Sequence, residues 1–490
     1  MGIKSVLAAV AFLTLTVSVI GIFVGLVEFY ASPVGSIDKV VSFRFLQYFS
    51  ITSIIFFGVT LLLRKYTVES ILEAFFVVVI AWLFIPFVSA LAYNYAIGMD
   101  FIDAFFESLS GFSGTGLTMI STPEDFPKTI LLWRAITQWV GELGVVVFAG
   151  TLLPALHRVI RSVYVVERGE RIAPTILSTM RILVGIYAFY TALGTIMFMM
   201  GGMSFFDAVT HSMTAIATGG MSTNSLSIGY WFKGSNWVIY TTTTIIMILG
   251  AFNFVDHVNL LKGRFKEFIT SIEIKWFFIF LALFTAPLVA VSLIQGDGYA
   301  AAIRFYHLVS GYTTTGFQLG SSNILKAEPE YVKVIITLSM IVGGATFSTA
   351  GGIKIKRAAI LMKSLVWESA RLFAPPAMVL RRRAGRELLE EKDLLAIYNF
   401  ISLYLLTFVL VSLTIHISLL LNNYTEFSFV DAMFETASAL SCVGLSVGIT
   451  SSSAPLAIKI TLIAAMYLGR LEFAALYLAI GYSYIKKVML

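Results

Sequence analysis

Residues Asp103–Gly116 read DAFFESLSGFSGTG, and the same kind of stretch returns three more times along the chain. The second copy, Asp207–Gly219, reads DAVTHSMTAIATG, and the fourth, Asp431–Gly444, reads DAMFETASALSCVG. The third is recognisable at its end, where Ser310–Gly316 reads SGYTTTG. From aspartate to glycine the spacing is 13 residues in the first and fourth copies and 12 in the second. A fourfold internal repeat is stronger evidence for a fold than any single motif.

Each copy lies between two long apolar runs. The chain of 490 residues is 58% hydrophobic and only 13% charged, and its mean hydropathy is +0.88. Because a soluble globular domain carries about 25% charged residues, this composition excludes the soluble class and makes the lipid bilayer the main solvent. The net charge of +6 comes from basic residues in short connections between apolar runs, which argues against a nucleic-acid partner.

We expect an all-α integral membrane protein with about ten spans, since about 20 apolar residues cross the hydrocarbon core of a bilayer. The expected spans are residues 6–28, 46–63, 71–95, 129–155, 181–200, 236–261, 275–295, 332–370, 394–421 and 454–485. An even number puts both termini on one side. That side holds most of the Lys and Arg, including Arg64, Lys65 and the run Arg381–Arg386, so the positive-inside rule makes it cytoplasmic. The predicted location is the plasma membrane.

The glycine-ended repeats are interpreted as re-entrant pore loops. A helix of about ten residues covers about 15 Å, half of the hydrocarbon core, so the chain must return as extended backbone. Such backbone is tolerated at membrane depth where it lines a water-filled cavity, and rings of carbonyl oxygens can replace the hydration shell of a cation. Glycine keeps side chains out of a narrow pore, and neighbouring threonine hydroxyls are expected to brace the loops.

The candidate filter residues are Ser113, Gly114, Thr115, Gly116, Ala217, Thr218, Gly219, Thr314, Thr315, Gly316, Cys442, Val443 and Gly444. The alternative interpretation is that small residues let transmembrane helices pack closely. That explanation suffices for one copy, but it does not account for four copies with a similar spacing.

Other polar groups in the repeats are assigned to structure. Asp103, Asp207 and Asp431 open the short helices and are expected to cap their N-termini. His211 and His307 show no metal-ligand spacing and are interpreted as packing residues.

A second motif, GGATFSTAGGIK at residues 343–354, interrupts the apolar run 332–370. That run is about twice as long as one crossing requires, and a helix does not continue comfortably through so many glycines. The sequence therefore predicts a break inside the membrane. A glycine-rich helix-packing stretch is the alternative.

Together these residues resemble the TrkH/KtrB family of potassium transporters, whose single chain holds four linked units of span, pore helix and span. The resemblance covers nearly the whole chain, and the two spans before the first repeat resemble the TrkH branch. It implies five segments: two extra spans in 1–66 and pore repeats in 67–172, 173–268, 269–390 and 391–490, the third containing an intramembrane gate loop.

The resemblance also implies the function. A glycine in all four filters goes with potassium preference in this family, and Gly116 holds the first position. The expected activity is potassium uptake without enzymatic chemistry, with K+ held at the filter carbonyl oxygens and no cofactor in this chain. A homodimer and a cytoplasmic nucleotide-binding regulatory subunit of the TrkA/KtrA type are the implied protein partners.

The family places its gate at the glycine-rich loop. The implied gate residues are Gly343, Gly344, Ser348, Thr349, Ala350, Gly351, Gly352, Lys354 and Arg470. Arg470 lies inside the last apolar run, where a charge usually faces a cavity or a partner. We expect it to bond carbonyl groups of the loop, or Ser348 and Thr349; pairing with Glu472 or snorkelling to the interface are the alternatives.

The sequence departs from the family pattern at four positions. Gly114 stands where a threonine is usual, Cys442 where an asparagine is common and Phe347 where a small residue is usual. Glu142 stands where the family has glycine; it either lines the inner cavity or pairs with a neighbouring helix.

Two rival functions remain open in the sequence. A secondary transporter that couples K+ to Na+ or H+ is one, since Glu142 and Glu472 are acidic groups within apolar runs. A sodium-permeable member of the same family is the other. A membrane-embedded enzyme is disfavoured because no nucleophile with a base or metal-ligand pair recurs in the spans.

Overall fold

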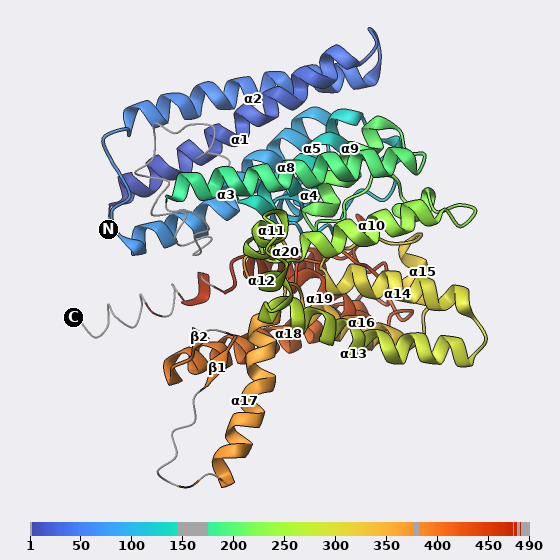
Figure 1. Ribbon diagram of the computed structural model, residues 1–490. Coiled ribbons are helices and arrows are strands. Elements are labelled where there is room, and N and C mark those ends of the chain that lie inside the picture. Colours follow the sequence, from blue (N-terminus) through green and yellow to red (C-terminus); the bar gives the residue numbers. More distant parts are fainter. Residues whose placement is uncertain are drawn as a thin grey trace.

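The computed structural model describes residues 2–144, 175–373, 375, 382–385, 387–473, 475–477 and 481 (Figure 1). This part of the chain is almost entirely helical, as expected. The exception is a hairpin of two-residue strands, β1 (Arg383–Ala384) and β2 (Glu387–Leu388), which pair antiparallel.

Six helices among the described residues are long and apolar enough to cross a membrane: α1 (Ile3–Ala31), α2 (Ile37–Leu62), α3 (Ile71–Ile97), α8 (Ile176–Met200), α13 (Ile272–Ile294) and α18 (Glu391–Leu421). Figure 1 shows most of them running across the molecule in similar directions. Each coincides, to within one residue at the C-terminal end, with or extends beyond one of the spans expected from the sequence.

The four repeats form a common unit of a long helix, a short helix and a second helix. The short helices are α4 (Phe101–Ser113), α9 (Phe205–Ile216), α14 (Gly298–Tyr312) and α19 (Phe429–Leu440). The second helices are α5 (Lys128–Leu143), α10 (Trp237–Gly250), α16 (Glu330–Val342) and α20 (Leu456–Arg470). The expected span 129–155 begins as α5, and its end lies outside the described residues.

Short and second helices alternate in a closed ring. Each second helix packs on the short helix of the next repeat, giving the pairs α5 with α9, α10 with α14, α16 with α19, and α20 with α4. The long helices α3, α8, α13 and α18 each pack on the short helix of their own repeat. The first two helices, α1 and α2, form a hairpin against α3 and α5, outside this ring.

The sequence predicts one straight span over residues 236–261, and the structure shows that this prediction is wrong. The run divides into α10 and α11 (Phe254–Leu261), which are bent by 112° relative to each other. Asn253 causes this break, because its side chain caps α11 at Val255 N, 2.8 Å away, and also donates to Glu273 and to Thr346 O. A polar side chain with these partners favours a new helix start over a continuous helix.

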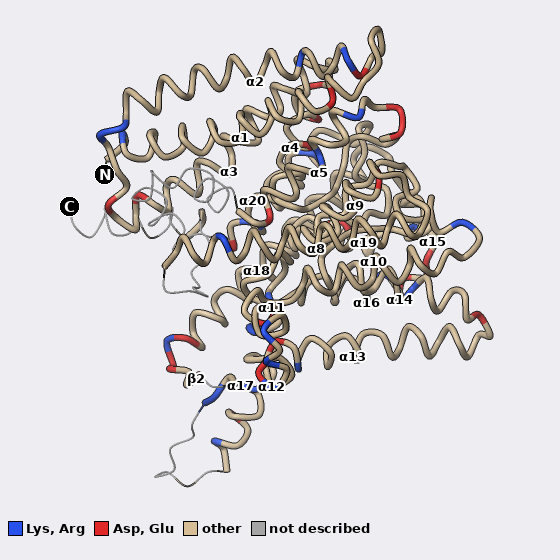
Figure 2. The backbone as a smooth tube through the Cα atoms, turned by 45° about the horizontal axis from the view of Figure 1, so that its top comes forward, with Lys and Arg blue, Asp and Glu red and all other residues tan. Residues whose placement is uncertain are grey.

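The remaining helices are shorter or lie outside the ring. They are α12 (Phe265–Ile269), α15 (Ser322–Ala327) and α17 (Ile355–Phe373), with 3₁₀ turns at Pro123–Asp125 and Ile228–Tyr230. In Figure 1, α17 projects away from the bundle. Figure 2 shows Lys and Arg gathered where α11, α12 and α17 meet.

The aspartates that open the repeats act differently from the expected caps. Asp100, Ser204 and Ser428 are the N-caps of α4, α9 and α19. The predicted aspartates lie in the first turn, where a negative charge interacts favourably with the helix dipole. Two of them also form buried ion pairs that join neighbouring repeats. These pairs are Lys333 with Asp431 and Lys459 with Asp103.

Candidate functional site

The segments after the four short helices share one backbone conformation. Gly114, Thr218, Thr314 and Cys442 each have a positive φ, between 49° and 68°. Threonine and cysteine rarely adopt this left-handed conformation, so its recurrence marks one structural position. We call these four residues the inner positions.

Two residues beyond each inner position comes a glycine, again with a positive φ: Gly116, Gly220, Gly316 and Gly444. The prediction of Gly219 at this position in the second repeat is wrong by one residue. Gly220 has a φ of +69°, whereas Gly219 has no positive φ. With Gly220 in place, the spacing from aspartate to glycine is 13 residues in the first, second and fourth repeats.

The four glycines form a closed ring of backbone contacts. A Cβ atom built on each glycine would lie only 2.0–2.4 Å from a carbonyl oxygen of the next repeat. The pairs are Gly116 with Gly219 O, Gly220 with Thr315 O, Gly316 with Val443 O, and Gly444 with Thr115 O. Since real Cβ atoms do not approach backbone oxygen so closely, a side chain is excluded at all four positions.

Local hydrogen bonds hold each loop in this conformation. In each repeat the residue before the ring glycine donates its N–H to the carbonyl six residues before that glycine, for example Thr115 to Ser110 O at 2.9 Å and Val443 to Ser438 O at 2.8 Å. Hydroxyl groups add a second brace in two repeats, between Ser113 and Thr115 at 2.7 Å and between Thr313 and Thr315 at 2.9 Å. Ala217 is the C-cap of α9.

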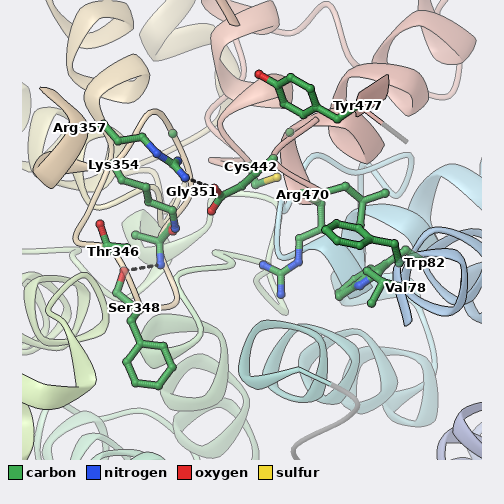
Figure 3. A pocket seen from close by; sticks show the side chains of 17 residues that line it. Val78, Trp82, Thr346, Ser348, Gly351, Lys354, Arg357, Cys442, Arg470 and Tyr477 are labelled. Atoms are coloured by element: carbon green, nitrogen blue, oxygen red, sulfur yellow. Dashed lines mark hydrogen bonds and ion pairs between the residues drawn. The ribbon is translucent and has the colours of Figure 1, made fainter. Parts of the chain in front are cut away.

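The ring separates two cavities. The first, of about 290 Å³, is lined by all four ring glycines, and we call it the four-glycine cavity. The second, of about 610 Å³, is lined by Cys442, Gly351, Gly352, Lys354 and Arg470, and we call it the loop cavity (Figure 3). Cys442 faces one cavity and Gly444, two residues later, faces the other, so the extended segment between them runs from one to the other.

A buried acceptor supports each loop on the four-glycine side. It lies nine residues before the ring glycine and is a glutamate in repeats 1 and 4 and a histidine in repeats 2 and 3: Glu107, His211, His307 and Glu435. We call these the backing residues. Two of the loop N–H groups that they bind are Met119 N, which donates to Glu107 at 2.8 Å, and Leu319 N, which donates to His307 Nε2 at 3.1 Å.

The same pattern holds in the other two repeats. Glu435 accepts from Val447 N at 3.1 Å and from Thr450 N at 3.0 Å. His211 Nε2 lies 2.9 Å from the Ser222 hydroxyl. This role was not predicted from the sequence, although alignment of the repeats on Gly220 in place of Gly219 shows that the position is always polar.

Two side chains of α5 link the first two loops. Arg134 is buried, binds Glu107 at 2.7 Å and donates to Ser222 O at 2.9 Å. Gln138 donates to Gly219 O at 2.6 Å and accepts from Met221 N at 3.1 Å. Neither residue was singled out in the sequence, because no local pattern says which loop a helix will contact.

The glycine-rich loop lies directly against the inner positions. Gly343 ends α16 with a φ of +69°, and the chain then turns back until α17 begins at Ile355. Gly351 N donates to the Thr314 hydroxyl at 2.8 Å, and the hydroxyls of Thr218 and Thr349 are 3.2 Å apart. A Cβ at Gly351 would lie 1.9 Å from Ser441 O. The predicted break therefore exists, and it touches repeats 2, 3 and 4.

Further hydrogen bonds fold the loop onto itself and onto α10. Ser348 Oγ donates to Ala345 O at 2.6 Å, and Thr349 Oγ1 donates to Gly250 O at 2.8 Å. Lys354 donates to Ala350 O across the loop. Gly344 and Gly352 are also packed closely, because a Cβ on either would lie within 3 Å of Ala350 or Gly343.

Arg470 has different partners from those expected. Its guanidinium pairs with Glu142 at 2.6 Å and donates to Gly141 O at 2.7 Å, both at the end of α5. It also lies over the ring of Trp82, 4.6 Å from the centroid, and extends into the loop cavity beside it (Figure 3). The alternative partner, Glu472, instead pairs with Arg357 of α17 at 2.5 Å.

The question about Glu142 is thereby resolved in favour of a neighbouring helix. Its side chain is 2% exposed and reaches from α5 to α20. Phe347 also has a clear neighbour, since its ring packs on Phe254 with centroids 5.7 Å apart.

The chain is similar in sequence to known proteins over most of its length. The TrkH family, described as cation transport protein, matches residues 41–481. The Trk system potassium uptake protein TrkH of Escherichia coli is 32% identical over 422 residues, which are 82% of this chain and 83% of that protein. An uncharacterized cation transporter of Methanocaldococcus jannaschii is 30% identical over 413 residues, 84% of this chain and 82% of its own.

A solved structure agrees with the fold. The crystal structure of the potassium transporter TrkH from Vibrio parahaemolyticus matches with a TM-score of 0.82 and 27% identity, over 98% of both chains.

Proposed function

This chain belongs to the TrkH family of potassium uptake transporters, and from that premise we propose that it conducts K+ through the ring of four loops. The observation that carries the proposal is the closed ring in which each glycine touches a carbonyl oxygen of the next repeat. The carbonyl oxygens of the residues around these glycines take the place of the hydration shell of K+. The C-terminal ends of the short helices direct negative partial charge toward the same point.

The two cavities give the ion a path on either side of the ring. In the proposed pathway K+ enters from the four-glycine cavity, crosses the ring and leaves through the loop cavity. The backing residues keep the loops rigid, since each holds backbone N–H or hydroxyl groups just beyond the ring glycine. No covalent step is required.

The loop 343–354 is the proposed gate. It packs against the inner positions through Gly351 and Thr349, and it lines the cavity through which the ion must leave. Its hydrogen bonds to the inner positions run through the side chains of Thr218 and Thr314, so the loop can be displaced without breaking the backbone contacts of the ring. This placement supports a closed state in which the loop blocks the inner end of the filter.

The surroundings of the pore follow the same proposal. The basic cluster where α11, α12 and α17 meet (Figure 2) supports a cytoplasmic location for that end, and for both termini, of a plasma-membrane protein. The proposed segment boundaries remain 1–66, 67–172, 173–268, 269–390 and 391–490. A homodimer with a cytoplasmic nucleotide-binding subunit is the proposed assembly, because Trk system relatives point to a transporter that works as part of a system.

The reversal potential of the protein in proteoliposomes, under opposed K+ and Na+ gradients, tests the filter. Gly116→Ser is expected to lower the K+ preference by about tenfold, because its side chain would displace the Gly219 carbonyl. Gly35→Ser is the matched control: Gly35 has nearly the same φ, +85° against +84°, but nothing lies within 4 Å of its Cβ position. An unchanged ion preference in Gly116→Ser would instead favour the coupled transporter.

The same recordings test the gate. Thr349→Val keeps the volume of the side chain but removes the hydroxyl whose single proton lies between Gly250 O and Ile216 O. This hydrogen bond stabilises the closed loop by about 1 kcal/mol, so the fraction of open channels is expected to rise several-fold. Thr407→Val, which loses a bond to Leu403 O on α18 outside the ring, is the control and leaves the open fraction unchanged. Equal behaviour of the two variants would remove the loop from gating.

A further inference from the structure

Glu142 and Arg470 occupy the same position in two different repeats. Each directly follows a glycine that packs against the end of a short helix: a Cβ at Gly141 would lie 2.0 Å from Phe112 O, and one at Gly469 would lie 2.0 Å from Leu440 O. Repeats 2 and 3 have small residues at this position, Ala251 and Gly344, which follow Gly250 and Gly343.

The inner position of the first repeat is also unusual. Gly114 has no side chain, whereas its counterparts are Thr218, Thr314 and Cys442. A Cβ built on Gly114 would lie 2.0 Å from Glu142 Oε1 and 2.6 Å from Glu142 Cδ. The carboxylate of Glu142 therefore fills the space that a side chain at position 114 would occupy.

We propose that Glu142 replaces the missing side chain of the first filter loop and at the same time holds Arg470 at the wall of the loop cavity. It is a positioning residue: its carboxylate packs against Gly114 and neutralises the guanidinium of Arg470, which otherwise faces the exit path. This inference rests on the proposed function, since it assigns Glu142 to the inner end of the same pore.

The physical reason lies in the position of the charge. Arg470 is 16% exposed and contacts the loop cavity, so its charge repels a cation there unless a carboxylate lies close to it. Glu142 lies 2.6 Å away and is almost completely buried, whereas Glu472, which lines the same cavity, pairs with Arg357. Removing Glu142 deprives Arg470 of its ion pair beside the path of the ion, which raises the barrier to conduction.

A double-mutant cycle tests the steric part. Threonine is the residue that repeats 2 and 3 use at the inner position, with φ values of 49° and 55°. In the native background Gly114→Thr collides with Glu142, and we expect the K+ flux into proteoliposomes to fall by about tenfold or more. In the Glu142→Ala background there is room, so Gly114→Thr is expected to change the flux by less than about twofold. Equal, additive effects in both backgrounds would overturn the proposal.

A second cycle tests the charge. Glu142→Gln keeps the size of the side chain and is expected to reduce K+ flux by about tenfold, while Glu142→Gln/Arg470→Gln recovers most of it. The current–voltage curve provides a readout that a purely structural role would not move, because an unpaired Arg470 opposes cations at one end of the pore and makes the current asymmetric. Failure of the Arg470 substitution to rescue either the flux or the symmetry would refute the neutralising role.

Glu328→Gln is the matched control for the loss of an ion pair. Glu328 pairs with Arg304 at 2.9 Å, and both side chains lie outside the two cavities. Flux and current symmetry are expected to stay at the native level in this variant. Gly116→Ser, recorded in parallel, separates the two hypotheses: coupling between positions 114, 142 and 470 without any effect of Gly116→Ser on selectivity would retain the pairing but reject the filter.

Discussion

Repeats 1 and 4 differ from repeats 2 and 3 on both sides of the glycine ring. On the four-glycine side, the backing residues are carboxylates in repeats 1 and 4 and imidazoles in repeats 2 and 3. On the loop side, repeats 2 and 3 use the threonines of their inner positions to contact the glycine-rich loop. Repeats 1 and 4 instead contribute the ion pair between Glu142 and Arg470.

The comparison shows that all four repeats share one backbone conformation, whereas the polar side chains around the ring are of one kind in repeats 1 and 4 and of another kind in repeats 2 and 3. Every repeat needs the same left-handed turn and the same glycine, because a carbonyl ring leaves no room for a side chain. Outside the ring, each repeat needs only an acceptor for backbone N–H or hydroxyl groups, and glutamate and histidine both supply one. The hydroxyl contacts to the glycine-rich loop then come from repeats 2 and 3, while the ion pair joins repeats 1 and 4.

The largest expected effect on K+ flux comes from breaking the ring itself in the second repeat. Gly220→Ala places a Cβ 2.0 Å from Thr315 O, a backbone atom that cannot move without disturbing the third loop. We expect K+ flux to fall by about a hundredfold, the equivalent of about 3 kcal/mol.

Gly219→Ala is the control for this prediction. Its Cβ would meet the side chain of Gln138, which can move more easily than backbone, and its φ is not positive. Flux in proteoliposomes is expected to fall by less than about tenfold. If Gly219→Ala were the more harmful substitution, the register originally expected from the sequence would be correct after all.

The second effect concerns the junctions between repeats. Lysines four residues after the prolines that precede α16 and α20 form buried ion pairs with the next short helix, whereas the first repeat has Leu131 at that place. Lys459→Met leaves Asp103 buried without its cation and is expected to lower the free energy of unfolding by about 3–5 kcal/mol. Chemical unfolding in detergent or bicelles measures this loss.

The double variant Lys459→Met/Asp103→Leu provides the control. Replacing both partners with apolar residues removes the uncompensated charge, so at least half of the lost stability is expected to return. A double variant as unstable as Lys459→Met would show that packing, and not the ion pair, holds repeat 4 to repeat 1.

The smallest effect distinguishes the two kinds of backing residue. Glu435→Gln turns an acceptor of several hydrogen bonds into a group that is half donor, so we expect a loss of about 1.5–3 kcal/mol in filter stability and a several-fold weaker K+ preference. His307→Gln keeps an oxygen that can accept from Leu319 N, and its effect on the reversal potential is expected to be less than about twofold. Equal effects would mean that the carboxylates and imidazoles are interchangeable, and the division between repeats would lose its functional meaning.

The sequence alone determined the membrane class, the fourfold repeat and the interruption at residues 343–354. These features are local: apolar runs of spanning length, short segments ending in glycine, and a glycine density that stops a helix are all visible without knowing what they touch. The resemblance to a potassium transporter family rested on the same segments, and the matches over residues 41–481 confirm it.

Only the tertiary structure decided which groups meet. It decided that Gly220 and not Gly219 belongs to the ring, that a backing residue supports each loop, and that Glu142 pairs with Arg470. The last two residues lie 328 positions apart in the sequence. In the sequence, Gly219 and Gly220 satisfy the repeat pattern equally well, and Glu142 could pair with any basic side chain within reach. Close packing of the four loops removes this freedom, because the Cβ position of Gly220 faces a carbonyl oxygen of the next repeat whereas that of Gly219 faces the side chain of Gln138.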